Sequence, residues 1–147
     1  MKTFTVGEMA ERIKRPGEGT EAAIYRLQNW TKEKIIQPIE ETRPGTGKRR
    51  LYSRASLVDA LLVQLLTDAM GMPALKIASQ LHELRKYVPE DRPSGISVLV
   101  ISTSLGSDRW AIGGAKTSHL SKFVGDSDYD VHVIVDLRKF YARLEED

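Results

Sequence analysis

The sequence predicts an α+β protein with an N-terminal winged helix-turn-helix domain followed by a small α+β module. Three observations lead to this fold class. Residues 6–33 carry two helix patterns separated by a turn rich in Pro and Gly. Residues 35–52 place a basic segment between two short apolar segments. Beyond a second breaker-rich segment, at residues 89–95, helical spacing gives way to β-branched runs that are typical of strands.

The first two helices are delimited by caps and breakers. Thr5 and Glu8 have the spacing of a capping box, in which each side chain satisfies a backbone amide at the start of a helix. The first helix is expected over about residues 6–14, and the second over about 20–33 after the turn at 15–19. The residues expected on the inner side of the second helix are Ala23, Ile24, Leu27 and Trp30.

The next elements predict a wing and two further helices. Residues 35–39 and 51–52 are expected to form the strands of the wing, with a flexible basic tip between them. Ser53 can cap a leucine-rich helix that Gly71 ends. One more helix is expected from Pro73, and its buried side is predicted to carry Ile77, Leu81, Leu84 and Val88.

The segment at residues 89–95 is the expected boundary between a domain at 1–88 and a module at 93–147. In the module, strands are expected at 96–101, 109–112 and 131–135, and Asp136 can cap a terminal helix. The apolar residues of that helix are Leu137, Phe140, Tyr141 and Leu144. About 55 residues bury little surface alone, so we expect the module to pack against a partner chain in a homodimer.

Composition narrows the function classes. The chain has no cysteine and three scattered histidines, which argues against a metal site, and we expect no cofactor. No apolar run is long enough to cross a membrane, and no signal peptide is recognisable, so a cytoplasmic protein without membrane contact is expected. Residues 1–54 hold 12 Lys and Arg against 7 Glu, whereas the whole chain has a net charge of only +2. A polyanion is therefore expected to bind the N-terminal third of the chain.

Three segments resemble the MerR family of transcriptional regulators. They are Phe4-Thr5-Val6-Gly7-Glu8-Met9-Ala10, Ile35-Ile36-Gln37-Pro38 and Arg50-Leu51-Tyr52-Ser53. The resemblance covers roughly residues 3–86. It implies a winged helix-turn-helix that binds double-stranded DNA, with the second helix in the major groove and the wing on phosphates. The chain breaks at Pro89, where the family continues a dimerising helix, and it lacks cysteine. The family's metal and redox inducers are therefore not implied, and the effector stays unknown.

These considerations give a set of candidate DNA-binding residues. Tyr25, Arg26 and Asn29 are expected to face outward on the second helix, whereas Trp30 and Tyr52 fit core packing at least as well as phosphate contact. Four cations belong to the wing. The complete set is Thr20, Tyr25, Arg26, Asn29, Trp30, Arg43, Lys48, Arg49, Arg50 and Tyr52.

Two alternatives to a transcriptional regulator stay open. A phage-type excisionase, which shapes DNA, also uses a small winged domain. A more remote alternative is a nucleotidyltransferase, because Gly106-Ser107 and the carboxylates of Asp128 and Asp130 are similar to that family's minimal pattern. The gap between the two parts is longer than in that family, so the protein is not expected to be an enzyme.

Overall fold

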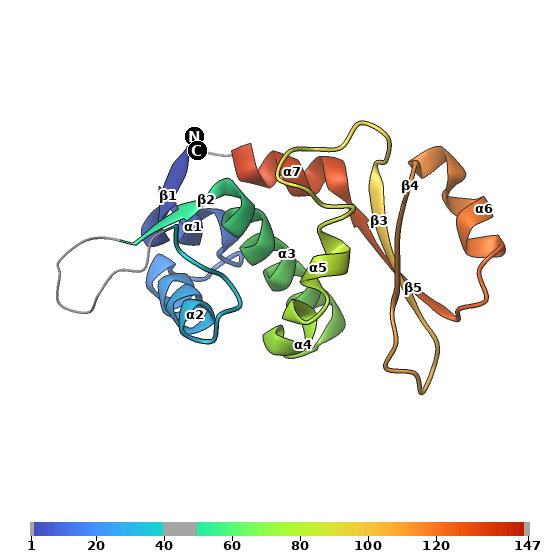
Figure 1. Cartoon of the computed structure of the whole chain (residues 1–147), viewed down its shortest axis with the longest axis horizontal. Helices are drawn as coiled ribbons and strands as arrows, with labels where there is room; N and C mark the ends of the chain where they lie inside the picture. The colour runs from blue at the N-terminus through green and yellow to red at the C-terminus, as the bar shows by residue number, and fades with distance from the viewer. Residues whose placement is uncertain (1, 40–49, 146–147) are drawn as a thin grey trace. The chain divides into compact units, whose positions relative to one another are not determined.

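The computed structural model describes residues 2–39 and 50–145, which form two compact units (Figure 1). The N-terminal unit is Met1–Leu81 and the C-terminal unit is His82–Glu145, so the division lies before the expected boundary at residues 89–95. Each unit combines helices with one small antiparallel sheet, which confirms the α+β class. None of the described helices is long and apolar enough to cross a bilayer.

The N-terminal unit contains a two-stranded sheet and four helices. The elements are β1 (Thr3–Thr5), α1 (Val6–Ile13), α2 (Thr20–Lys32), β2 (Leu51–Ser53), α3 (Arg54–Met70) and α4 (Ala74–Ala78). The prediction of a strand at residues 35–39 is wrong. The strand that pairs with β2 is β1, with Phe4 opposite Tyr52. The Ile39 amide still donates to the Leu51 carbonyl at 2.8 Å, so the two ends of the wing segment lie side by side.

Local signals place the start of α1 and both ends of α3 where they were predicted. The Glu8 amide donates to the Thr5 hydroxyl at 3.2 Å, and the Thr5 amide donates to the Glu8 carboxylate at 3.1 Å, which confirms the capping box. The Thr5 amide, as the donor to the Glu8 carboxylate, holds the pKa of Glu8 below its usual value. The Ser53 hydroxyl accepts from the Ser56 amide at the start of α3, and Gly71 ends α3 in the left-handed conformation.

The single helix expected after Pro73 is interrupted. It forms α4 and a separate short α5 (Leu81–Leu84). The Ser79 hydroxyl donates to the Lys76 carbonyl at 2.6 Å, and such a local bond competes with helix continuation. The four residues predicted on the buried side are all buried: Ile77, Leu81, Leu84 and Val88.

The C-terminal unit is built on a three-stranded antiparallel sheet. Its elements after α5 are β3 (Val98–Thr103), β4 (Ala111–Ala115), η1 (Thr117–His119), α6 (Leu120–Gly125), β5 (Val131–Asp136) and α7 (Leu137–Glu145). The strand order is β4-β3-β5. Strands were predicted in all three regions, although β3 and β4 each begin two residues later than expected.

Helices pack on the sheet at its apolar positions. Leu120 and Phe123 of α6 pack against Val98, Val100 and Ala115. On α7, the predicted apolar residues are all buried, and the amides of the first turn donate to the Asp136 carboxylate, which confirms the predicted cap. Helix α7 itself packs against β3 and β5.

Candidate nucleic-acid interface

The turn between α1 and α2 is fastened by Glu18. The turn passes through Gly17 at a positive φ of 79°, and the Glu18 carboxylate accepts from the Arg15 amide at 3.1 Å. The same carboxylate accepts two parallel bonds from the Arg26 guanidinium, each 2.8 Å long. A bidentate pair of this kind is strong and directional, so it fixes α2 relative to the turn.

A second pair connects the turn to α3. The Arg15 guanidinium donates to both carboxylate oxygens of Asp68, with Nη2 to Oδ1 at 2.9 Å. The Gln64 side chain donates to the same carboxylate at 2.7 Å. Glu18 and Asp68 thus hold the turn, α2 and α3 together, and the donors lower the pKa of Asp68.

This network predicts a stability change with pH. The Arg26 and Arg15 donors lower the pKa of Glu18 from 4.5 to about 2. The charged carboxylate is therefore favoured in the folded state, so its stabilisation is present above pH 4.5 and is lost as the pH falls toward 2. Glu18→Gln is expected to lower the free energy of unfolding by about 1–3 kcal/mol at pH 7, because two charge-assisted bonds are lost. Urea unfolding at pH 7 and pH 3 measures this, and the difference between the two proteins should shrink at pH 3.

Glu33→Gln provides the control for that comparison. Glu33 is exposed at the C-terminal cap of α2, and its side chain takes no part in the network. The control should unfold like the wild type at both pH values. A Glu18→Gln protein with wild-type stability at pH 7 would contradict a structural role for the Glu18 pair.

The outward face of α2 differs from the one predicted. Its buried stripe is Ala23, Leu27 and Trp30, whereas Ile24 is only half-buried. At about 100° per residue, this stripe turns Tyr25 and Gln28 toward solvent. Tyr25 is 67% exposed, and Gln28 is also exposed.

Arg26 does not face outward, and that expectation is wrong. Its side chain is 16% exposed, it is paired with Glu18, and the guanidinium carbon lies 5.9 Å from the centre of the Trp30 ring. Asn29 is half-buried and borders a hollow on the side of α4, beside the exposed Leu75.

Gln28 is a residue that the sequence reasoning missed. It lines a hollow together with Gly7 at the start of α1, Arg50 before β2, and Tyr52 in β2. Arg50 is exposed there, at the base of the wing segment. The hollow thus lies between one edge of the exposed face of α2 and Arg50. The missed signal is the helical periodicity itself, since a buried stripe centred on Leu27 leaves position 28 on the outer half.

Three other predicted residues have structural partners. Tyr52 is 1% exposed and Trp30 is 6% exposed, which places both in the core. The Thr31 hydroxyl donates to the Leu27 carbonyl at 2.9 Å, so the Tyr52 hydroxyl is the donor in its 2.8 Å bond to Thr31. The Thr20 hydroxyl donates to the Glu11 carboxylate at the start of α2.

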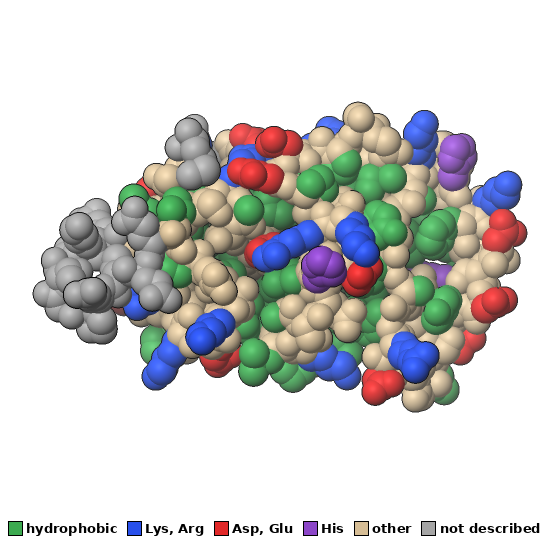
Figure 2. Space-filling view, in the orientation of Figure 1, with side chains coloured by type: hydrophobic (Ala, Val, Ile, Leu, Met, Phe, Trp, Pro, Cys, Tyr) green, Lys and Arg blue, Asp and Glu red, His purple; other side chains and the backbone are tan. Residues whose placement is uncertain are grey.

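The four wing cations are not all described by the structure. Arg43, Lys48 and Arg49 lie outside the described residues, whereas Arg50 lies within them. Over the face shown in Figure 2, Lys and Arg side chains are interspersed with Asp and Glu and form no continuous patch of one sign.

The acidic residues near β5 lie at the surface of the C-terminal unit. Asp128 and Asp130 are exposed, and one Asp130 oxygen lies 3.5 Å from the Leu105 amide. Within residues 2–39 and 50–145, no three His, Asp or Glu side chains are grouped so that they could hold a metal ion.

No family model matches the chain, and no curated protein matches it. The candidate interface consequently depends on its own geometry: an exposed helix face, the hollow beside it and the base of a basic segment.

Proposed function

We propose that the protein is a sequence-specific, double-stranded DNA-binding transcriptional regulator of the MerR type. The observation that carries this proposal is the exposed face of α2, which adjoins the base of the basic wing segment through the hollow shared by Gln28 and Arg50. A helix of this kind fits the major groove, and a neighbouring cationic loop reaches the adjacent phosphates.

Two of the exposed residues of α2, Tyr25 and Gln28, have suitable chemistry for bases. The Gln28 amide can donate and accept together, which matches the N6 and N7 edge of adenine. Tyr25 exposes a large ring and a hydroxyl, which can contact a thymine methyl group or a phosphate oxygen. Because the Glu18 network holds α2 in place, these side chains are presented on a rigid helix.

Arg50 is proposed to contact a phosphate at the base of the wing. Arg50→Ala should weaken binding to all duplexes and reduce the slope of log Kd against log salt by about 1, because one fewer counterion is released. Fluorescence anisotropy over a salt series, with cognate and random duplexes, measures this. Lys122→Ala removes an exposed cation from α6 and should leave the slope unchanged. An unchanged slope for Arg50→Ala would remove Arg50 from the interface.

A homodimer is part of the same proposal. Strand β5 is an edge of the sheet, and no described strand pairs with its other side. Its residues 131–135 carry four β-branched apolar side chains, of which Val131 and Ile134 are 46% and 44% exposed. An exposed apolar edge of this kind readily pairs with another strand. We infer that β5 pairs with its counterpart in a second copy, so that the dimer presents two DNA-binding units.

Genome-wide footprinting tests the regulatory role. A transcriptional regulator should protect sites at promoters. Protection confined to attachment sites would instead identify an excisionase, and random protection would argue against sequence-specific binding.

A further inference from the structure

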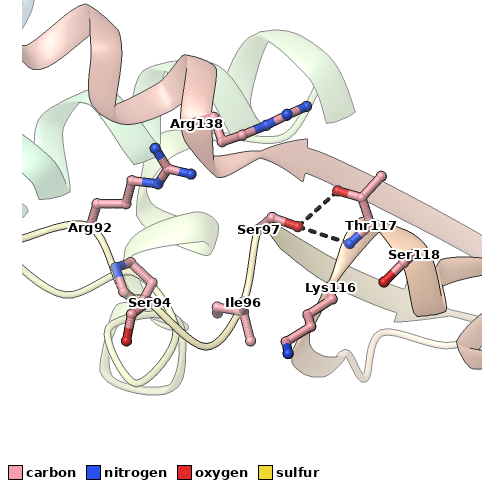
Figure 3. A pocket seen from close by; sticks show the side chains of 9 residues that line it. Arg92, Ser94, Ile96, Ser97, Lys116, Thr117, Ser118 and Arg138 are labelled. Atoms are coloured by element: carbon pink, nitrogen blue, oxygen red, sulfur yellow. Dashed lines mark hydrogen bonds between the residues drawn. The ribbon is translucent and has the colours of Figure 1, made fainter.

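The C-terminal unit contains a basic hollow that the DNA-binding proposal does not use. It has a volume of about 590 Å³ and opens where β3 begins and where β4 ends (Figure 3). Three cationic side chains line it: Arg92, Lys116 and Arg138. Four serine and threonine hydroxyl groups complete its polar lining. Its size is in the range of small-molecule sites.

The charge balance of this hollow favours an anion. None of the residues that line it is acidic. The Asp136 carboxylate, which does not line the hollow, lies 3.4 Å from Arg138 Nη2. The Arg138 side chain is nevertheless 58% exposed, so part of its donor fork stays available to a ligand. Arg92 and Lys116 are also exposed.

The floor of the hollow is held rigidly by Ser97. Its amide donates to the Ala115 carbonyl at 2.9 Å, and its carbonyl accepts from the Leu137 amide at 3.0 Å. Its hydroxyl accepts from the Thr117 amide at 2.8 Å and shares a second 2.8 Å bond with the Thr117 hydroxyl. These bonds tie the ends of all three strands together beneath the cations, so a ligand would meet a preformed polar surface.

We propose that this hollow binds a small ligand that carries two or more linked phosphate groups. Figure 3 shows Arg92 and Arg138 on one side of the Ser97–Thr117 pair and Lys116 on the other. Cations on two sides match two linked phosphates better than one compact anion. Guanidinium groups bind phosphate oxygens through paired N–H donors, and lysine adds a point charge.

Calorimetric titration of the full chain with pyrophosphate and with inorganic phosphate tests this site. Pyrophosphate should bind saturably with one molecule per chain, and more tightly than phosphate. Arg92→Ala and Lys116→Ala should each weaken pyrophosphate binding by about tenfold, as expected for the loss of one charge-assisted contact. Arg92→Lys should recover part of the affinity, because it restores the charge without the paired donors.

The control is Lys122→Ala, which removes an exposed lysine of the same unit outside the hollow. This variant should bind pyrophosphate like the wild type. Absence of saturable binding, or equal binding by the wild type and the Arg92→Ala protein, would overturn the site. Equal affinities for phosphate and pyrophosphate would overturn the requirement for linked phosphates.

Measuring duplex binding by the same variants distinguishes a small phosphorylated ligand from the phosphates of a nucleic acid. If the hollow binds a small ligand, Arg92→Ala and Lys116→Ala should leave the affinity for random duplex unchanged in the absence of pyrophosphate. A loss of duplex binding in both variants, together with competition between pyrophosphate and duplex, would identify the hollow as a DNA-backbone contact and overturn the small-ligand proposal. This outcome is distinct from a failure of the α2 interface, which the Arg50 and α2 variants report.

Discussion

Replacing Ile134 by lysine is expected to separate the protein into monomers and to lower its affinity for a palindromic duplex by roughly 10²–10⁴, because the second DNA-binding unit is no longer held nearby. Binding to a single half-site should change far less. Sedimentation velocity gives the oligomeric state, and anisotropy with palindromic and half-site duplexes gives the affinities.

The reason for this effect lies in the cross-strand neighbours of Ile134. It pairs with Val100 of β3, which is fully buried, while Ile134 itself is 44% exposed at the free edge. Helix α6 covers Val98, Val100 and Ala115, so this face of the sheet is covered at β3 and β4. A second copy placed against β5 would cover the same face of the sheet at β5. Lysine at an edge strand opposes such pairing, because its charge would be buried between the copies.

Val124→Lys is the matched control for this substitution. Val124 is an apolar residue of α6 in the same unit, and it is 37% exposed. Lysine at Val124 should leave the dimer intact. A wild-type protein that sediments as a monomer, or an Ile134→Lys protein that stays a dimer, would show that β5 does not assemble the protein.

The features that the sequence predicts well are those that neighbouring residues determine. The capping box of Thr5 and Glu8, the Gly71 stop and the Asp136 cap each involve residues within a few positions of one another. Their hydrogen bonds form wherever the chain enters or leaves a helix, so tertiary contacts do not alter them. The buried face of α7 follows from the same local periodicity.

The features that it does not predict depend on distant partners. Strand β1 is three residues long and pairs with β2 almost fifty residues later, so no local alternation marks it. Residues 35–39 look like a strand by composition, yet only the Ile39 amide makes a strand-like bond to β2. Tertiary pairing outweighs local propensity at both places.

For a related reason, only part of the candidate site was predicted from the sequence. Tyr25 is exposed as expected. Ile24 was expected to face inward, which placed the buried side of the helix incorrectly. As a result Arg26 was predicted to face outward, and Gln28 was not predicted to be exposed. The Arg26 partner, Glu18, lies in the preceding turn and not on the helix, so the periodicity of α2 does not reveal the pair. The sequence therefore predicted α2 itself and misjudged which of its side chains are exposed.

The last prediction concerns those available side chains. The double variant Tyr25→Ala/Gln28→Ala should lose roughly 2–6 kcal/mol of preference for the cognate duplex over random duplex, about 1–3 kcal/mol for each base contact. Neither residue is a cation, so the salt slope should stay unchanged. Both side chains are exposed, so the free energy of unfolding should change by less than about 0.5 kcal/mol for each substitution.

Leu75→Ala and Arg26→Ala complete that experiment. Leu75 is a 57% exposed residue of α4, and its loss should leave both affinities unchanged. Arg26→Ala should destabilise the fold by breaking the Glu18 pair, and its DNA affinity should therefore be compared at temperatures well below its unfolding transition. Anisotropy with cognate and random duplexes then separates the roles. If the double variant weakens both duplexes equally, α2 only positions the protein on the backbone. If it weakens neither, the outward face of α2 does not contact DNA, and the major-groove part of the proposal fails.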